Sequence, residues 1–449
     1  MRSRSTPVNG RGGFGTSSGT TGGRVAALDR IAPMRPHLRS LIRASVGPAR
    51  PGFRRFWLAT AISVLGTWMA AIALAIRMYD VTGSPGWVSA LLFAELTPLV
   101  LIGFLFGHRL DRLPVRAALI AADVASVGVF AVLAAVDTPW IVVALAGLAG
   151  VAGGVFRPLA TAAVPLLVPD EDLEPATGAI GSADNAMTFL GELVGGVLVG
   201  SVGAAVALGL NAASFAASAL LIAGCGALAR PGTVDSPGRA SLHVRATVRR
   251  IRMSPVLRQI ALGWAVAAVV LGVVLSVQVP LLRGQFHASP AAVGLILGLD
   301  ALGLVAGSMF AGSRTFGRAA FPLALAGMGA AVMIAGASTW LPLAAFGLTI
   351  LGVFNGVAIV LNRTRAVREA EAGERVGLIA FLIAVAVSGQ VAGTVLGGVL
   401  ATVLSPRWAF VVSGSVALLV AAPVAHAVGP RAEWVLRESP WAPRGRGER

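Results

Sequence analysis

Residues 191–198 read Gly-Glu-Leu-Val-Gly-Gly-Val-Leu, and residues 393–400 read Gly-Thr-Val-Leu-Gly-Gly-Val-Leu. A shift of 202 residues places the three glycines of the first string on the three glycines of the second. A shift of 205 residues gives four further matches: Ser84-Pro85 with Ser289-Pro290, Glu95 with Asp300, Gly107 with Gly312, and Arg109 with Arg314. The chain is therefore predicted to consist of two related halves.

Both strings lie within apolar stretches of the length that crosses a bilayer, about 20 residues for a helix. The chain is 56% hydrophobic and 12% charged, whereas soluble domains carry about 25% charged residues. We therefore predict an all-α polytopic membrane protein whose twelve transmembrane helices form two parallel six-helix pseudo-repeats. The predicted spans are about 56–79, 87–107, 117–136, 140–160, 178–200, 204–229, 257–281, 291–312, 319–339, 341–362, 376–402 and 408–428.

The placement of arginine predicts how the chain is oriented. All 36 basic residues are Arg, and with the N-terminus inside 33 of them fall on the cytoplasmic side. Only Arg77, Arg283 and Arg407 fall on the other side. Cytoplasmic loops of membrane proteins carry such an excess. We therefore expect a multi-pass protein of the inner (plasma) membrane with both termini in the cytoplasm. This placement also argues against nucleic acid as the partner of a chain with a net charge of +16.

Composition divides the chain into five segments. We expect a disordered basic arm over 1–52, a six-helix half over 53–230, a cytoplasmic linker over 231–255, a second half over 256–430, and a disordered tail over 431–449. In the linker, Val244, Val248 and Ile251 recur at helical spacing among arginines, which predicts an amphipathic helix on the membrane surface. Anionic lipids are the expected partners of the arm and the linker. We expect a monomer.

Several kinds of chemistry are disfavoured by what the chain contains. Without Lys no phosphate-binding Gly-x-x-x-x-Gly-Lys loop is possible, so ATP hydrolysis is excluded. The single cysteine, Cys225, and five scattered histidines predict neither a disulfide nor a metal site. No serine–histidine–acid constellation is visible. We therefore expect neither an enzyme nor a cofactor.

The loop between the second and third spans reads Gly107-His-Arg-Leu-Asp111-Arg112-Leu-Pro-Val-Arg116. It resembles the cytoplasmic loop Gly-x-x-x-Asp-Arg-x-x-x-Arg of the major facilitator superfamily. Three further segments resemble its branch of enterobactin-type siderophore exporters and macrolide efflux pumps: residues 53–69, 210–223 and 249–258. The resemblance covers about 53–430. It implies two parallel halves with a substrate site between them near the midplane.

The chain departs from the family pattern at three places. Glu192 follows Gly191 where antiporters of the family carry Gly-Pro before a Gly-Gly pair. Thr67 stands where the branch usually has an acid. The family also has an Arg embedded in the fourth span, whereas Arg157 is predicted near the cytoplasmic end of that span. These departures leave the route of proton coupling open.

The loop of Gly107, Asp111, Arg112 and Arg116 is interpreted as a gate. A carboxylate beside a helix N-terminus is stabilised by the exposed N–H groups. Arg112 and Arg116 would pair with carboxylates of the other half in one conformation and release them in the other. The alternative is that these positive charges only orient the helices.

Ionisable side chains inside a span are candidates for function, because burying one costs about 2.5–3.5 kcal/mol or more. Glu95 and Asp300 occupy corresponding places in the two halves and are candidate substrate or proton sites. Asp184, Thr188 and Glu192 are spaced at i, i+4 and i+8, so they are predicted to share one helix face. Glu192, near the midplane, is the preferred proton carrier. Interhelical hydrogen bonding is the alternative for each.

Uncharged polar residues complete the set of candidates for the space between the halves: Gln278, Asn355 and Gln390. Hydrogen bonding between helices is the competing role for these residues. Asp123, in the third span, is expected to be structural.

We predict a proton-coupled secondary transporter that exports small amphipathic molecules, drug-like or siderophore-like, by alternating access. Export rests on the family resemblance, because the residues themselves indicate only gated transport with titratable groups. An importer or uniporter of a small metabolite is the alternative within transport. A membrane receptor or scaffold without turnover is a more distant alternative, and a membrane enzyme would need a catalytic cluster that we do not find.

Overall fold

The computed structural model describes residues 50–110, 113–225, 228, 248–314, 316–317, 319–369 and 375–426. Within them the chain forms helices only: α3 (Pro51–Thr82), α4 (Pro85–Leu110), α5 (Val115–Ala135), α6 (Pro139–Leu167), α7 (Asp170–Val202), α8 (Ala204–Ala223), α10 (Pro255–Pro280), η1 (Leu281–Gln285), α11 (Pro290–Gly312), α12 (Ala320–Ala337), α13 (Leu341–Glu369), α14 (Arg375–Val403) and α15 (Pro406–His426). Twelve of these segments are long and apolar enough to cross a membrane, which confirms the predicted number of spans.

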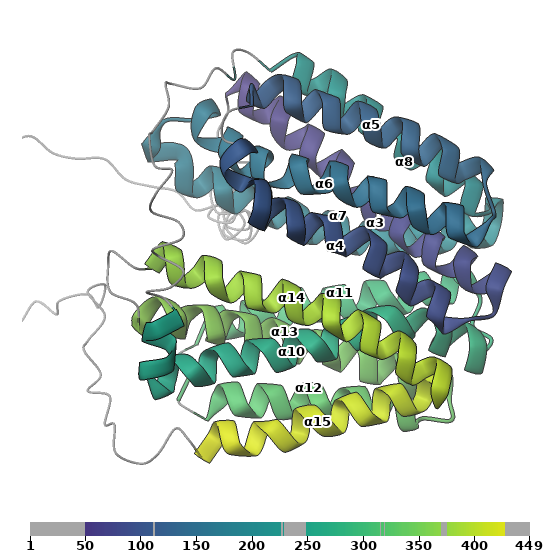
Figure 1. The fold of residues 1–449 in the computed structure, drawn as a ribbon, viewed down its shortest axis with the longest axis vertical. Coiled ribbons are helices and arrows are strands. Elements are labelled where there is room, and N and C mark those ends of the chain that lie inside the picture. Colours follow the sequence, from purple (N-terminus) through teal and green to yellow (C-terminus); the bar gives the residue numbers. More distant parts are fainter. Residues whose placement is uncertain are drawn as a thin grey trace, which may run out of the picture.

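The helices form two bundles, α3–α8 and α10–α15, which lie side by side (Figure 1). The packing within one bundle is repeated in the other. α3 packs on α7 and α8, as α10 packs on α14 and α15. α4 packs on α6 as α11 packs on α13, and α5 packs on α6 and α8 as α12 packs on α13 and α15. The two parallel pseudo-repeats expected from the sequence are therefore present.

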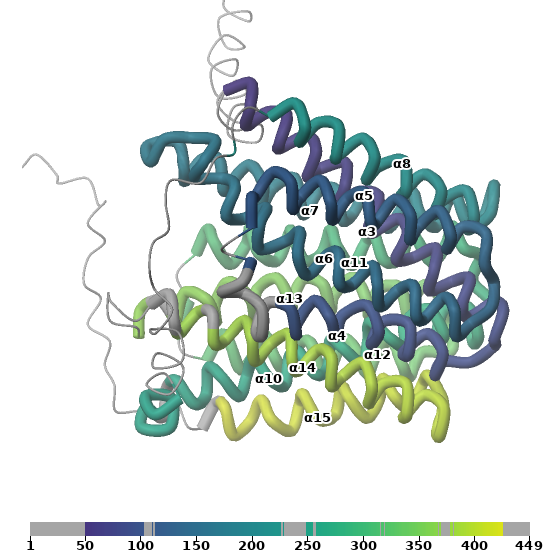
Figure 2. The backbone as a smooth tube through the Cα atoms, turned by 45° about the horizontal axis from the view of Figure 1, so that its top comes forward, coloured from purple at the N-terminus to yellow at the C-terminus, as the bar shows by residue number. Residues whose placement is uncertain are grey.

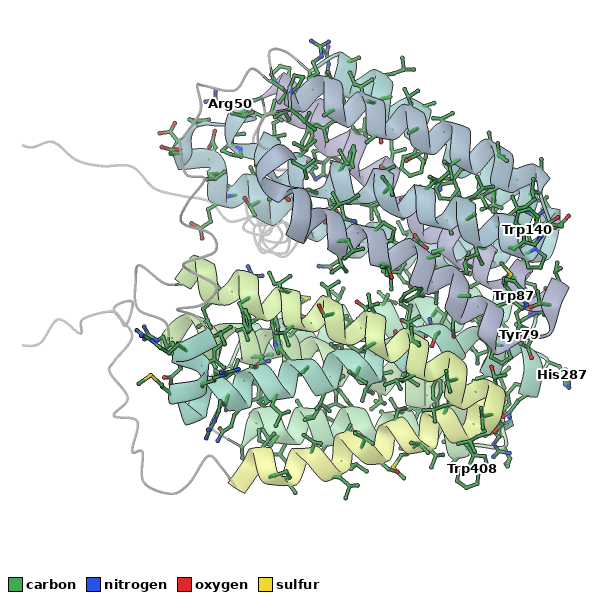
Figure 3. All side chains as sticks on the ribbon, viewed as in Figure 1. Arg50, Tyr79, Trp87, Trp140, His287 and Trp408 are labelled. Atoms are coloured by element: carbon green, nitrogen blue, oxygen red, sulfur yellow. The ribbon has the colours of Figure 1, made fainter. Side chains whose placement is uncertain are left out.

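The two ends of the molecule are distinct (Figures 1 and 2). We call one the Asp80 end; it holds the short connections 83–84, 203 and 286–289. The opposite, Asp170 end holds the connection 168–169, and there the two bundles stand farther apart. Exposed aromatic side chains gather at the Asp80 end, among them Trp87, Trp140 and Trp408 (Figure 3). Trp side chains favour the membrane–water interface, so this end is predicted to lie at one.

The first two glycines of each string let helices approach closely within each half. A Cβ added to Gly191 or Gly195 would lie 2.7 Å from the carbonyl oxygen of Leu65 or Met69 in α3. Glycine removes that clash, so α7 can lie directly on the α3 backbone. The second half repeats these contacts between α14 and α10: Gly393 on Val269 and Gly397 on Val273.

The third glycine of each string joins the two halves instead. A Cβ on Gly196 of α7 would lie 2.5 Å from Cα of Gly294 and 2.6 Å from the carbonyl oxygen of Pro290, both in α11. Its counterpart Gly398 of α14 meets Ser89 of α4 in the same way, at 2.5 Å. All four helices meet within about six residues of their Asp80-end termini, so the halves are closed together at that end.

Three helix boundaries differ from the predicted spans by seven residues or more. α13 continues to Glu369 rather than ending near 362. α6 continues to Leu167, past Pro158 and Pro165, rather than ending near 160. α7 begins at Asp170 rather than near 178, with Asp170, Glu171 and Asp172 in its first turn. Acidic residues stabilise a helix N-terminus electrostatically but lower local hydropathy, so hydropathy alone places the helix start too late.

The predicted arm and tail lie outside the described residues, as does most of the linker over 231–255. Residues 248–253 of the linker are helical. Ile251 is 8% exposed and packs with Leu257 and Ile260 of α10, Ala366 of α13 and Leu378 of α14. This apolar residue of the predicted amphipathic helix therefore contacts protein.

Candidate functional site

Three acidic side chains lie at one depth in the molecule. Glu95 is ten residues from Pro85, where α4 begins, and Asp300 is ten residues from Pro290, where α11 begins. Glu192 is ten residues before Val202, where α7 ends. Each is therefore about 15 Å along its helix from the Asp80 end. We call these three residues the acidic layer.

Glu192 and Asp300 come from opposite halves and interact electrostatically. Glu192 is 8% exposed, and its backbone carbonyl lies against Gly294 of α11. Neither Oε2 of Glu192 nor Oδ1 of Asp300, both buried atoms, has a hydrogen-bond partner among the described residues. Two ionised carboxylates placed this way repel each other, so a proton or a cation between them would be stabilising.

Glu95 and Asp300 occupy equivalent packing positions. The backbone carbonyl of Glu95 lies against Gly150 of α6, and that of Asp300 lies against Gly352 of α13. Oδ1 of Asp300 would be 2.7 Å from a Cβ on Gly352. The glycines allow each acid-bearing helix to pack closely on its neighbour, which fixes both acids at the same depth.

A second charged pair lies nearer the Asp170 end. Arg157 is 18 residues from Pro139 in α6, and Asp184 is 18 residues before Val202 in α7. Both are therefore about 27 Å from the Asp80 end, and both are exposed. The charge of Arg157 acts on Asp184 and on Glu95, but no ion pair forms between them. α6 continues ten residues beyond Arg157, to Leu167. The position of Arg157 near the cytoplasmic end of the membrane span stays a prediction.

The polar stripe predicted on α7 is divided between two environments. Asp184 is exposed and interacts with Arg157, whereas Glu192 is buried and interacts with Asp300. The hydroxyl of Thr188 donates to the backbone carbonyl of Asp184 at 2.8 Å. Thr188 is therefore satisfied by its own helix.

The remaining polar candidates are less exposed. Gln278 of α10 is 7% exposed and Asn355 of α13 is 9% exposed, while Gln390 of α14 is half-buried. Asp123 is 1% exposed in α5, next to Ser218 of α8 and away from the interface between the halves.

The predicted gating loop is described only in part. Gly107 lies in the last turns of α4, whereas Asp111 and Arg112 fall outside the described residues. Arg116, in the first turn of α5, donates to the backbone carbonyl of Ala223 at the end of α8. In this conformation Arg116 therefore caps a helix of its own half. Its role as a gate stays a prediction.

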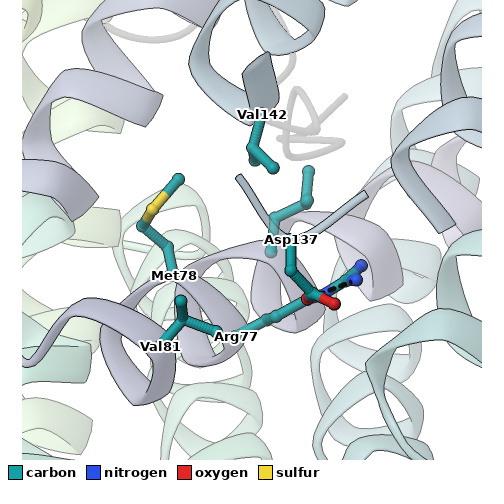
Figure 4. A pocket seen from close by; sticks show the side chains of 6 residues that line it. Arg77, Met78, Val81, Asp137 and Val142 are labelled. Carbon is teal, nitrogen blue, oxygen red and sulfur yellow. Dashed lines mark hydrogen bonds and ion pairs between the residues drawn. The ribbon is translucent and has the colours of Figure 1, made fainter. Parts of the chain in front are cut away.

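Charged contacts at the Asp80 end join helices within and between the halves. Arg283 in η1 forms a two-point ion pair with Asp80 of α3, with Nη2 2.7 Å from Oδ1 and 2.8 Å from Oδ2. Arg77 of α3 donates to Asp137 at 2.7 Å in a small pocket lined also by Met78 and Val142 (Figure 4). Sequence reasoning missed the Asp80–Arg283 pair because hydropathy treats both residues as span ends. The sequence feature that could have identified the pair is the location of Asp80 and Arg283 at the ends of equivalent spans.

Comparison with solved structures shows the same fold in several transporters. A bacterial homologue of the human lysosomal transporter Spinster, inward-facing and unoccupied, has a TM-score of 0.68 at 14% identity, over 85% of this chain and 98% of that one. The nucleoside transporter NupG has a TM-score of 0.68 at 12% identity, over 84% and 99%. The POT-family transporter PepTSo has a TM-score of 0.66 at 12% identity, over 85% and 98%.

None of the curated proteins matches the chain by sequence. The family model of the Major Facilitator Superfamily matches residues 56–279 and 260–448, which together span both halves. Two parallel six-helix halves, closed on each other at one end, are the architecture in which such transporters place substrate between their halves. This chain belongs to the Major Facilitator Superfamily of transporters.

Proposed function

We propose that the protein is a proton-coupled exporter of small amphipathic molecules in the plasma membrane. The Asp80 end would face outward and the Asp170 end the cytoplasm, in accordance with the 33-to-3 division of arginines. In this orientation the conformation described here is closed to the outside. Rocking of α3–α8 against α10–α15 would then open the site alternately to each side.

The observation that carries the proposal is the electrostatic interaction of Glu192 with Asp300 across the two halves, at the place where the Glu192 backbone carbonyl packs against Gly294 of α11. Glu192 Oε2 and Asp300 Oδ1, which have no hydrogen-bond partner among the described residues, lie on the Asp170 side of the Gly196–Gly294 contact. We propose that this side faces the cytoplasm. A proton bound by either carboxyl would permit this closed arrangement by removing the repulsion between two negative charges. Loss of the proton would leave two negative charges that repel the halves apart. Proton binding and release would thereby be linked to the side on which the site is open.

The test is proton movement in everted membrane vesicles that hold a pre-formed pH gradient. Cationic dyes, macrolides and siderophores are added one at a time to vesicles with wild-type protein, Glu192→Gln or Asp184→Asn. Substrate-triggered proton release is expected from the wild type and should be absent from Glu192→Gln. Asp184→Asn should retain it, because Asp184 interacts with Arg157 and not with the pair across the halves. Compounds that stabilise the purified protein but move no protons would contradict the coupling.

The second candidate is an importer or uniporter of a small metabolite. The residues of the acidic layer are equally compatible with this direction of flux. Net flux of a labelled substrate in vesicles of each orientation separates the two: uptake into everted vesicles indicates export from the cell.

A further inference from the structure

The two helices that hold the Gly196–Gly294 contact carry a second pair of glycines at matching positions. α7 and α11 run in opposite directions, so a step towards the Asp170 end lowers the residue number in α7 and raises it in α11. A step of 18 residues leads from Gly196 to Gly178 and from Gly294 to Gly312. An α-helix has 3.6 residues per turn, so 18 residues make five full turns, about 27 Å. Gly178 and Gly312 are therefore on the same helix faces as the pair in contact.

Other glycines of α11 show which way this face points. Gly298, about one turn from Gly294, lies against Phe189 of α7, with 3.3 Å between an added Cβ and the phenylalanine ring. Gly303 is two and a half turns from Gly294 and so on the opposite side of the helix, where it meets α13 instead. The face that carries Gly294 and Gly312 is therefore the face turned to the other half.

Gly178 and Gly312 make no close contact in this conformation. A Cβ added to either glycine would meet nothing within 4 Å among the described residues, and both glycines are exposed. The two bundles stand farther apart at this end (Figure 1). Glycine inside a helix is less favourable than alanine, and small residues in membrane helices serve close helix approach. These two glycines therefore weaken their helices without serving a contact in the closed-at-Asp80 arrangement.

We propose that Gly178 and Gly312 come into contact when the Asp170 end closes, so that α7 and α11 have two alternative glycine contacts, one for each conformation. Glu192 lies four residues from Gly196, and Asp300 lies six residues from Gly294, so both acids lie between the two contacts. Straight helices that pivot between the contacts can form only one of them at a time. This inference rests on the rocking of the halves proposed above, but on neither proton coupling nor export.

The second interface between the halves repeats the pattern. Ser89 of α4 meets Gly398 of α14 near the Asp80 end. The same step of 18 residues leads from this pair to Gly107 and Ala380, which are also small. These are the positions that the two repeat shifts relate to the free glycines of α11 and α7. Each pair of facing helices thus has a small residue on both sides at both ends.

Charges at the Asp170 end favour the proposed contact. Arg314 lies two residues beyond Gly312, is exposed, and rests over the ring of Phe310 at 4.9 Å. The register of the two helices places Arg314 level with residue 176, about one turn from Asp172 in the acidic first turn of α7. Closure would therefore bring an arginine of one half towards acids of the other, which attract it.

Disulfide formation tests the contact directly. Gly178→Cys and Gly312→Cys are combined in a Cys225→Ser background, in the full chain in lipid nanodiscs, with copper–phenanthroline as the oxidant. A disulfide needs Cα atoms within about 7 Å. We expect this pair to form a disulfide. Gly178→Cys with Leu302→Cys is the control pair and should stay reduced, because Leu302 is exposed but ten residues out of register, about 15 Å.

A steric test uses the opposite end of the molecule as its readout. Spin labels on Trp140→Cys and Trp408→Cys, in the Cys225→Ser background, report whether the Asp80 end is open. Gly196→Ala should raise the open population by disturbing the outer contact. Gly178→Ala added to Gly196→Ala should lower the open-to-closed ratio about tenfold, because the new Cβ obstructs the inner contact.

Gly128→Ala in α5 is the matched control for the steric test. Nothing lies within 4 Å of its added Cβ among the described residues, and α5 packs on α6 and α8 of its own half. Added to Gly196→Ala, it should leave the open-to-closed ratio unchanged. The melting temperature of each variant shows that it is folded.

The inference is overturned if the labels show the Asp80 end opening while the Gly178–Gly312 pair forms no disulfide. It is also overturned if the control pair bridges equally fast, or if Gly178→Ala acts no differently from Gly128→Ala. Failure of the proposed function has other signatures. A single closed distance in every variant would remove the rocking of the halves, and the inference with it. Opening and bridging as expected, without proton release in the vesicle assay, would leave the two contacts standing and remove only the coupling.

Discussion

Asp80 and Arg283 join the two halves through the ends of equivalent helices. Asp80 lies in the last turn of α3, and Arg283 lies in the π-helical segment that continues α10. The guanidinium contacts both carboxylate oxygens and also donates to the backbone carbonyl of Ala288 at 2.8 Å. Arg283 therefore holds its own connecting segment and the other half of the protein at the same time.

Replacing Asp80 with Asn is expected to weaken closure of the Asp80 end. The side chains of the pair are 39% and 23% exposed, so the pair contributes about 1 kcal/mol and its loss shifts the closed-to-open ratio about fivefold. Spin labels on Trp140→Cys and Trp408→Cys, in a Cys225→Ser background, report the distance between the halves. Asp137→Asn is the control, because Asp137 pairs with Arg77 inside one half. An equal shift in both variants would contradict this role.

The Gly196–Gly294 contact predicts a steric effect. Alanine at Gly196 places a Cβ 2.5 Å from the Cα of Gly294, so the closed arrangement is expected to be lost and the label distance to lengthen. Gly209→Ala in α8 is the matched control, because nothing lies within 4 Å of its added Cβ. Outside the contact, alanine should stabilise the helix by up to about 1 kcal/mol. An unchanged distance in Gly196→Ala would show that the contact does not determine closure.

Arg407 is expected to contribute to stability rather than to transport. Its guanidinium donates to the backbone carbonyls that end α12, those of Gly336 at 3.2 Å, Ala337 at 2.9 Å and Ser338 at 3.1 Å. Arg407→Gln should lower the free energy of unfolding by about 1–2 kcal/mol, because these carbonyls lose charged donors. Arg407→Lys should recover part of the loss. Thermal denaturation followed by tryptophan fluorescence measures both, and an unchanged melting temperature in Arg407→Gln would refute the expectation.

Cys225 is expected to react slowly with maleimides in the folded protein. The residue is 1% exposed, and burial raises the pKa of its thiol. The positive charges of Arg55 and Arg116 lower this pKa, but their effect is smaller than that of burial. Because the thiolate is the reactive form, little of it is present at neutral pH and reactivity should rise as the pH rises above the ordinary thiol range. Trp140→Cys, 65% exposed in the wild type, provides the reference rate in the same preparation. Equal rates at neutral pH would contradict the burial of this thiol.

The glycine strings and the acidic residues show how much of the candidate site could be predicted from the sequence. Repeat spacing paired Glu95 with Asp300, and the structure places both on glycine-mediated helix crossings at one depth. The same reasoning grouped Glu192 with Asp184 on one helix face. Only the packing of the helices showed that Glu192 interacts electrostatically with Asp300, and Asp184 with Arg157. A helical periodicity defines which residues share a face, but it does not define which neighbouring helix that face meets.

The number of spans, the two parallel halves and the positions of the membrane-embedded acids followed from the sequence alone. They depend on hydropathy and on internal repetition, which are properties of the chain taken locally. The tertiary structure alone decided that Gly196 contacts Gly294 and that Arg283 reaches Asp80. These relationships join segments far apart in the chain, and they arise from the close approach of whole helices. A local pattern of residues does not predict which distant helices will approach each other.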